Sequence, residues 1–157
     1  MSLVLDSNSY QDVVGAEVYF ATRLASTAWI EASTSDKEAA LCTSTRMLDE
    51  LSWKGQSVSP EQPLAFPRYG EYFDTRQGYV RGMSPTPLCV KVLCCELALH
   101  ILGSTDVLSD TGRVMDFDVG GVSLSRIQPP PRIPPQILKG VTTMLNSPTG
   151  LLVFVGA

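Results

Sequence analysis

The stretch LCVKVLCCELALHIL, residues 88–102, decides the fold because it is apolar on nearly every face of a helix. A helix of this kind needs packing partners on all sides. Pro85 and Pro87 lie at its expected start, where a missing N–H costs nothing, and Gly103 supplies its C-terminal cap. Residues 88–102 therefore predict the central helix of a core. The stretch is too short to span a bilayer, and it contains three polar residues, Lys91, Glu96 and His100.

Two further helices are expected before it. Ser9 and Asp12 form a capping box that would start a helix near Tyr10 and carry it to about Ser26. Its apolar face is centred on Val14, Val18, Ala21 and Ala25 and is widened by Tyr19, Phe20 and Leu24. We expect these two valines to face the core.

Ser35 and Glu38 form a second capping box, and Asp36 adds negative charge where the helix dipole favours it. Apolar residues then recur at steps of three and four up to Leu51, and Gly55 follows. The pattern predicts a helix from about Asp36 to Leu51.

The chain after residue 103 changes its period. Alternating residues flank a Gly-Gly pair in GRVMDFDVGGVSLSRI, which predicts a β-hairpin over about Arg113 to Ile127. The proline-rich stretch 128–136 predicts an extended spacer, and a short helix is expected from Gln136 to Asn146. The end, SPTGLLVFVGA, is apolar and β-prone, so it either completes a sheet or docks on a neighbour.

Together these patterns predict a mainly α fold: a small bundle of about four helices with one inserted β-hairpin, a long ordered loop and an extended C-terminal arm. We divide the chain into a helical domain over residues 1–127 and an arm over 128–157 that holds the proline-rich joint, the short helix and the apolar tail. At 157 residues the chain is long enough to bury a core without metal or disulfide support.

Net charge and cysteine spacing argue against two classes of function, the coating of nucleic acid and metal binding. The net charge of −4 opposes a protein that coats nucleic acid through its phosphates, although a local basic patch remains open. No signal-peptide pattern is present, so we expect synthesis and assembly in the cytoplasm. The four cysteines have no C-x-x-C spacing and His100 is not at a zinc interval from them, which favours reduced cysteines in a core and neither a metal nor another cofactor.

An enzyme would need a nucleophile with its base, paired carboxylates, a metal or a phosphate cradle, and the sequence is poor in all four. His100 lies within the apolar stretch, which favours a structural role over a catalytic one. Asp116 and Asp118 share one strand face, which a solvated surface explains as well as an acid–base pair does. We therefore expect no catalytic activity.

An irregular loop is expected from Leu51 almost to Ser84, and its first part, LSWKGQSVSPEQPLAFPRYGEYF (residues 51–73), leaves two alternatives open for its role. Aromatic rings beside cations are typical of single-strand DNA binding, which could use Trp53, Phe66, Arg68 and Tyr69, helped by neighbouring aromatic and basic residues. These additional residues are Lys54, Tyr72, Arg76, Tyr79 and Arg81. Alternatively Trp53, Phe66 and Arg68 are anchors that fasten a long loop to the helices.

Five short blocks of the sequence carry a family resemblance. The blocks SYQDVVGAEVYFATR, STSDKEAALCTSTRMLD, WKG, LAFPR and CELAL, in this order, resemble a family of tailed-phage head-tail connector proteins, also labelled DnaT-like single-strand DNA-binding proteins. The segment after LAFPR and the stretch RIQPPPRIPPQ depart from the family pattern, so contact residues cannot be transferred directly.

The resemblance implies a structural virion protein at the head–tail junction. It implies a homo-oligomeric ring, of about twelve copies, that binds the portal protein and offers a docking surface to a tail or tail-completion protein, with packaged DNA passing through its channel without sequence-specific binding. The expected subunit or portal contacts are Tyr69, Tyr72, Phe73, Arg76, Tyr79, Gly120, Gly121, Arg132, Leu151, Leu152 and Phe154.

Overall fold

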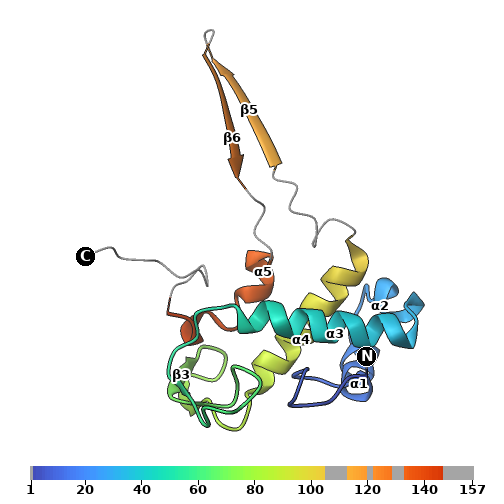
Figure 1. Ribbon diagram of the computed structural model, residues 1–157, viewed down its shortest axis with the longest axis vertical. Coiled ribbons are helices and arrows are strands. Elements are labelled where there is room, and N and C mark those ends of the chain that lie inside the picture. The colour runs from blue at the N-terminus through green and yellow to red at the C-terminus, as the bar shows by residue number, and fades with distance from the viewer. Residues whose placement is uncertain (1, 105–112, 120–121, 129–132, 147–157) are drawn as a thin grey trace.

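The computed structural model describes residues 2–104, 113–119, 122–128 and 133–146. These residues form five α-helices, one 3-10 helix and three small antiparallel sheets of two strands each (Figure 1). The prediction of a mainly helical domain with an inserted β-hairpin is thereby confirmed.

The core is built around α3 (Thr34–Asp49) and α4 (Leu88–Gly103), which cross and pack along their lengths (Figure 1). Helix α4 has the boundaries that its apolar sequence predicted, with Pro87 as its N-cap. Its buried positions are Val90, Leu93, Cys94, Cys95, Leu97 and Ala98. Helix α3 starts earlier than predicted because Ser33, not Ser35, is the N-cap: its hydroxyl accepts the Asp36 N–H at 3.2 Å.

The first predicted helix is shorter than expected: α1 covers Val13–Ala21, and a short helix that the sequence did not predict, α2 (Thr27–Glu31), follows it. Asp12 is the N-cap of α1 and accepts the Gly15 N–H at 2.7 Å, so the helix cannot begin at Tyr10. The left-handed backbone of Ala25, with φ of 58°, separates the two helices.

The centre predicted for the apolar face of α1 was also wrong, although Phe20, expected at its edge, is buried. Val14 and Val18 are exposed, and the buried residues of α1 are Ala16 and Phe20. The ring of Phe20 packs on the fully buried Trp29 of α2, with ring centroids 4.7 Å apart. This aromatic contact decides which face of α1 meets the core, since it buries far more apolar surface than the two valines could.

Residues 51–84, predicted as an irregular loop, contain four short strands. β1 (Gln56–Ser57) pairs with β2 (Arg68–Tyr69), and β3 (Glu71–Asp74) pairs with β4 (Tyr79–Gly82). The turn between β3 and β4 ends at Gly78, whose φ of 72° is the left-handed conformation that closes such turns.

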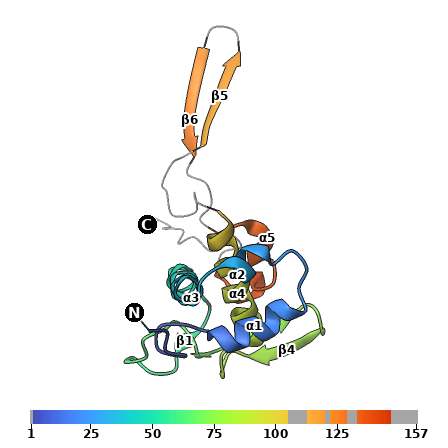
Figure 2. The ribbon, with the colours of Figure 1, turned by 90° about the vertical axis from the view of Figure 1, so that its right-hand side faces the viewer.

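The predicted hairpin is formed by β5 (Arg113–Val119) and β6 (Val122–Gln128), with Val119 opposite Val122. Both views draw these two strands clear of the helices (Figures 1 and 2). The predicted contact residues Gly120, Gly121, Arg132, Leu151, Leu152 and Phe154 lie outside the described residues.

The predicted helix from Gln136 to Asn146 is also shorter than expected. α5 (Pro135–Leu138) ends before Gly140, and the 3-10 helix η1 (Thr142–Met144) follows. Buried side chains of residues 133–146 join the same core as the helices. The chain is fastened there to residues 52–54: the Lys54 N–H donates to the Met144 carbonyl at 2.8 Å, and the Asn146 N–H donates to the Ser52 carbonyl at 2.9 Å.

Candidate nucleic-acid interface

A buried polar contact fastens the segment that carries the candidate interface. The Tyr10 hydroxyl, fully buried, donates to the Asp49 carboxylate and accepts the Phe66 N–H at 3.3 Å. The same carboxylate oxygen accepts the Ala65 N–H at 3.1 Å. Burial, followed by the hydrogen bond and charge of Asp49, raises the pKa of Tyr10, so its proton stays on the phenol. Residues 65–66 are thus held to the end of α3.

Trp53 and Phe66 lie in the core. Their side chains are 4% and 3% exposed, their rings meet edge to face with centroids 4.8 Å apart, and Trp53 Nε1 donates to the Leu48 carbonyl at 2.8 Å. A ring buried in this way cannot stack on a nucleic-acid base. The structure therefore removes Trp53 and Phe66 from the single-strand binding surface that the sequence left open.

Arg68 is occupied by backbone carbonyls. Its guanidinium donates to the carbonyls of Lys54 at 2.8 Å, Gly55 at 2.7 Å and Ala65 at 3.1 Å. These three bonds use the planar fork of donors to join the residues just before β1 to the end of the loop between β1 and β2. A phosphate could engage this guanidinium only by displacing them.

Gly55 permits this close crossing of the chain. A Cβ atom at this position would lie 2.0 Å from the Tyr69 carbonyl oxygen, and the φ of 74° is left-handed. Glycine is therefore required for β1 to approach β2.

The exposed side chains of this region lie on the short strands. Tyr69 is 63% exposed and Tyr79 is 69% exposed. Arg76 in the turn is exposed, and the side chain of Arg81 is 49% exposed. We call these four residues, Tyr69, Arg76, Tyr79 and Arg81, the hairpin surface.

The register of the strands assigns side chains to the two faces of the β3–β4 hairpin. Tyr72 lies opposite Arg81 and Asp74 lies opposite Tyr79, so these four share one face. That face turns toward the body at Tyr72, which is half-buried with its hydroxyl 3.9 Å from Cys89 Sγ, and it reaches solvent at Tyr79. Phe73 and Val80, also opposite each other, share the other face.

The local charge differs from that of the whole chain. Residues 68–82 contain three arginines and two carboxylates, a balance of +1, whereas the chain carries −4. One carboxylate is committed locally: Asp74 Oδ2 lies 3.4 Å from Arg81 Nε, and Asp74 Oδ1 accepts the Arg76 N–H at 3.0 Å. The region thus combines exposed tyrosines with two exposed arginines, of which Arg81 pairs with Asp74 and donates to the Gln77 side chain.

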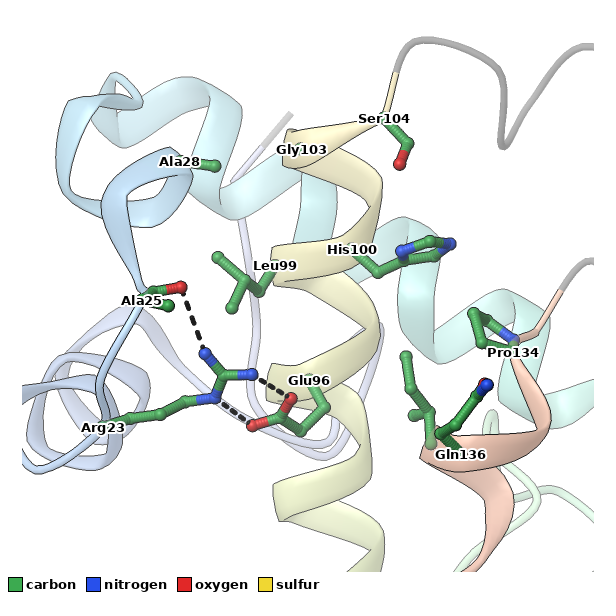
Figure 3. Close-up of a pocket in the computed structure, with 11 residues that line it drawn as sticks. Arg23, Ala25, Ala28, Glu96, Leu99, His100, Gly103, Ser104, Pro134 and Gln136 are labelled. Atoms are coloured by element: carbon green, nitrogen blue, oxygen red, sulfur yellow. Dashed lines mark hydrogen bonds and ion pairs between the residues drawn. The ribbon is translucent and has the colours of Figure 1, made fainter.

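A pocket of about 660 Å³ lies elsewhere, between α2, the C-terminal half of α4 and α5 (Figure 3). Its wall includes the ion pair between Arg23 and Glu96, in which Nε and Nη2 donate to the two carboxylate oxygens at 2.5 Å and 2.8 Å. The Tyr19 hydroxyl donates to the same carboxylate at 2.5 Å, and its pKa is raised to about 12 by burial and then by this bond. Glu96 therefore has three donors and is not free to act as a base.

His100 lines the same pocket, on the side of α5 (Figure 3). Glu96 lies one helical turn before it on α4 but is tied to Arg23, and no hydrogen bond joins the two side chains in the described structure. The pocket thus brings together an ion pair and an imidazole without the nucleophile and base contact that acyl transfer needs.

The thiols are equally poor candidates for chemistry. Cys94 is buried, with its Sγ 3.0 Å from the Ser44 hydroxyl, and burial raises the pKa of this thiol. Within residues 2–104, 113–119, 122–128 and 133–146, no group of histidine, cysteine or acidic residues could hold a metal ion. No helix in this part of the chain is long and apolar enough to cross a membrane.

The described residues thus define a mainly helical domain in which the exposed aromatic side chains, Tyr69, Phe73 and Tyr79, lie on β2 and on the β3–β4 hairpin. The hairpin also carries the exposed Arg76 and Arg81. The chain matches the model of the family described as "Putative DnaT-like ssDNA binding protein" over residues 2–144, and it belongs to this family. No curated protein matches the chain, and no solved structure matches it.

Proposed function

We propose that the chain is a single-stranded DNA-binding protein that acts by binding rather than by catalysis, and that the hairpin surface contacts the strand. The observation that carries this proposal is the exposed Tyr79, which shares a strand face with Arg81, in a region of local charge +1 that also holds the exposed Arg76 and Tyr69. The description of the family supports the choice of ligand.

The chemistry of the surface fits a strand bound without regard to sequence. Each tyrosine offers a ring on which any base can stack, which contributes about 1–3 kcal/mol per base. Arg76 and Arg81 can contact phosphates in turn. The rest of the chain carries −5, the difference between −4 and the +1 of residues 68–82, so repulsion elsewhere would confine the strand to the hairpin.

The test is fluorescence anisotropy with a labelled oligothymidine at about 50 mM salt, where phosphate contacts are strongest. The Tyr79→Ala variant should weaken binding about 5- to 150-fold, the equivalent of one lost stacking contact. The Arg81→Ala variant should also weaken binding, because it removes a phosphate contact. Arg46→Ala is its matched control, because Arg46 is an exposed arginine on α3, outside the hairpin surface. Equal affinities of the wild type and the Arg81→Ala and Tyr79→Ala variants would exclude this surface.

A second candidate function is the head-tail connector: a ring of about twelve copies that binds the portal, docks a tail protein and lets packaged DNA pass through its channel in the virion. It is supported by the resemblance noted from the sequence and by the outward face of α1. Val14 and Val18 lie one turn apart on that face and are both exposed, an arrangement that favours burial against another subunit.

Light scattering after size-exclusion chromatography, and co-sedimentation with portal rings, test the connector. The Val18→Lys variant should prevent ring formation, whereas Glu61→Lys, a charge change in the exposed loop between β1 and β2, should leave rings intact. A wild-type protein that remains a monomer and does not sediment with portal rings would rule this function out.

A further inference from the structure

Strand β4 forms an exposed edge of its sheet. Its four residues, Tyr79–Gly82, are all exposed, and within the described part of the chain β4 pairs only with β3. An edge strand of this kind offers unpaired backbone N–H and C=O groups to another strand. We propose that β4 pairs antiparallel with β4 of a second copy of this chain, so that two hairpins join into one four-stranded sheet.

The hydrogen bonding at the end of the hairpin fixes which backbone groups are available. The Met83 N–H donates to the Gly70 carbonyl at 3.0 Å. These two residues flank the opposed pair of Glu71 and Gly82, which is therefore a non-hydrogen-bonded pair. The two kinds of pair alternate along an antiparallel ladder, so the next non-hydrogen-bonded pair is the one that contains Val80.

Val80 therefore directs its backbone groups toward the open edge. A residue in a non-hydrogen-bonded pair turns its N–H and C=O away from the neighbouring strand. Among the described residues, none outside the hairpin bonds to the N–H or the C=O of Val80. Val80 of a second copy, placed directly opposite, would exchange two N–H···O bonds with it.

The sequence of β4 is complementary to itself in this register. When Val80 lies opposite Val80 of the second copy, Tyr79 lies opposite Arg81 of that copy, and the two-fold symmetry of the contact produces this pair twice. A guanidinium beside a tyrosine ring is a favourable contact. The Arg81 side chain is 49% exposed, so it can meet the ring while it keeps its ion pair with Asp74.

The neighbouring registers are unfavourable. A shift of two residues in one direction places Arg81 opposite Arg81 of the second copy, and like charges directly opposite each other destabilise a sheet. A shift of two residues in the other direction places Val80 opposite Gly78, which lies in the turn with a left-handed φ of 72°. The register centred on Val80 is therefore the one that the sequence favours.

Apolar side chains support the same register. Phe73 and Val80 lie opposite each other on one face of the hairpin and are 48% and 61% exposed. Pairing through β4 would bring both residues of each copy into one row across the four strands, and directly opposed apolar side chains stabilise a sheet. This row and the two pairs of Tyr79 with Arg81 favour a second copy over an unrelated peptide.

The inference goes beyond the proposed function, because pairing at the edge requires no DNA. The joined sheet would carry Tyr79 and Arg81 of both copies on one face, since residues opposite each other in a sheet share a face. A strand bound at the hairpin surface would then meet side chains of both copies, a consequence that rests on the proposed function.

The experiment measures amide hydrogen exchange of the full chain by ¹H–¹⁵N spectroscopy, without DNA, between about 20 μM and about 1 mM, a range suited to a weak dimer. When about nine tenths of the chain is dimeric, the Val80 amide should exchange about tenfold more slowly, because it is open only in the monomer. The Arg81 amide lies in a hydrogen-bonded pair within the hairpin and should depend little on concentration. Light scattering should show a mass that rises from one chain toward two.

Three variants test the register, with Kd measured by the same light scattering. Val80→Pro removes the N–H that donates to the second copy but none that donates within the hairpin, and it should raise the Kd about 30-fold, the equivalent of two lost hydrogen bonds. Val80→Lys leaves the backbone intact and opposes two like charges, so it should also raise the Kd if Val80→Pro fails to fold. Ile30→Lys is the matched control, because Ile30 is an exposed β-branched residue on α2, and its Kd should stay within about twofold.

Two results would overturn the inference. The first is a Val80 amide whose exchange does not depend on concentration up to about 1 mM. The second is association that Val80→Lys leaves unchanged and Val18→Lys abolishes, which would place the second copy on α1. Because no DNA is present, either result is separate from the outcome of the oligothymidine titration.

Discussion

The substitution Tyr10→Phe tests how the segment before the hairpin is held. It removes one oxygen atom from a ring that is fully buried and leaves the apolar contacts of the ring in place, including the edge-to-face contact with Phe66 at a centroid distance of 6.0 Å. What is lost is the hydroxyl that donates to Asp49 and accepts the Phe66 N–H.

The size of the effect follows from these two bonds. A hydrogen bond to a charged group contributes about 1.5–3 kcal/mol, and a buried N–H that loses its acceptor costs about 1 kcal/mol or more. We expect Tyr10→Phe to lower the free energy of unfolding by about 2–4 kcal/mol. With a urea m-value of about 2 kcal/mol/M, the midpoint would fall by about 1–2 M.

The assay is urea unfolding followed by circular dichroism and by tryptophan fluorescence, with coincident curves as the check for a two-state transition. Tyr19→Phe is the matched control, because its hydroxyl donates to Glu96, which keeps both bonds from Arg23 and is partly exposed. That control should cost about 0.5–1 kcal/mol. Equal effects of the two substitutions, or a loss below about 0.5 kcal/mol for Tyr10→Phe, would refute the claim that this buried contact fastens the segment.

Three further outcomes are expected. Burial raises the pKa of Asp49 above its ordinary value of 3.8, so between these two pKa values the native state holds a proton that the unfolded chain has lost. The wild type should therefore lose stability relative to Asp49→Asn as pH rises from about 4. Urea unfolding of both proteins across this pH range measures the difference. Trp53→Phe removes the bond to the Leu48 carbonyl and should cost about 1–3 kcal/mol in the same assay, yet leave DNA affinity unchanged because the ring is buried. Asp74→Asn keeps the acceptor for the Arg76 N–H but removes the charge that Arg81 faces, so oligothymidine affinity measured by anisotropy should rise about two- to fivefold at low salt, and an unchanged affinity would argue against a phosphate at Arg81.

The elements that the sequence predicted correctly are those with strong and redundant signals. Helix α4 is apolar on nearly every face and bounded by proline and glycine, and the β5–β6 sequence alternates around a Gly-Gly pair. The early end of α1 and the short helix α2 were missed because the left-handed residue between them is Ala25, a residue type that gives no turn signal. The central face of α1 was missed because Phe20 packs on Trp29, which lies in a helix that the sequence did not predict.

The β3–β4 hairpin was not predicted from the sequence because large aromatic residues fall on both of its faces, which hides the alternation of apolar and polar residues expected of a strand. Tyr72 faces the body while its neighbour Phe73 faces outward. The distinction between buried Trp53 and exposed Tyr79 could not come from composition, since both are aromatic residues near a cation in the same irregular stretch. Only the packing against α3 and the bonds to backbone carbonyls distinguish the buried or bonded residues, Trp53, Phe66 and Arg68, from the exposed Tyr79.

The central claim, single-strand binding at the hairpin surface, is tested most directly by the salt dependence of oligothymidine binding to the wild type and to Arg81→Ala. We predict measurable binding at about 50 mM salt that weakens as salt rises, with a slope of log K against log salt reduced by about 0.7 in the variant for one lost phosphate contact. An absence of binding at low salt, or a slope that Arg81→Ala does not change, would contradict it.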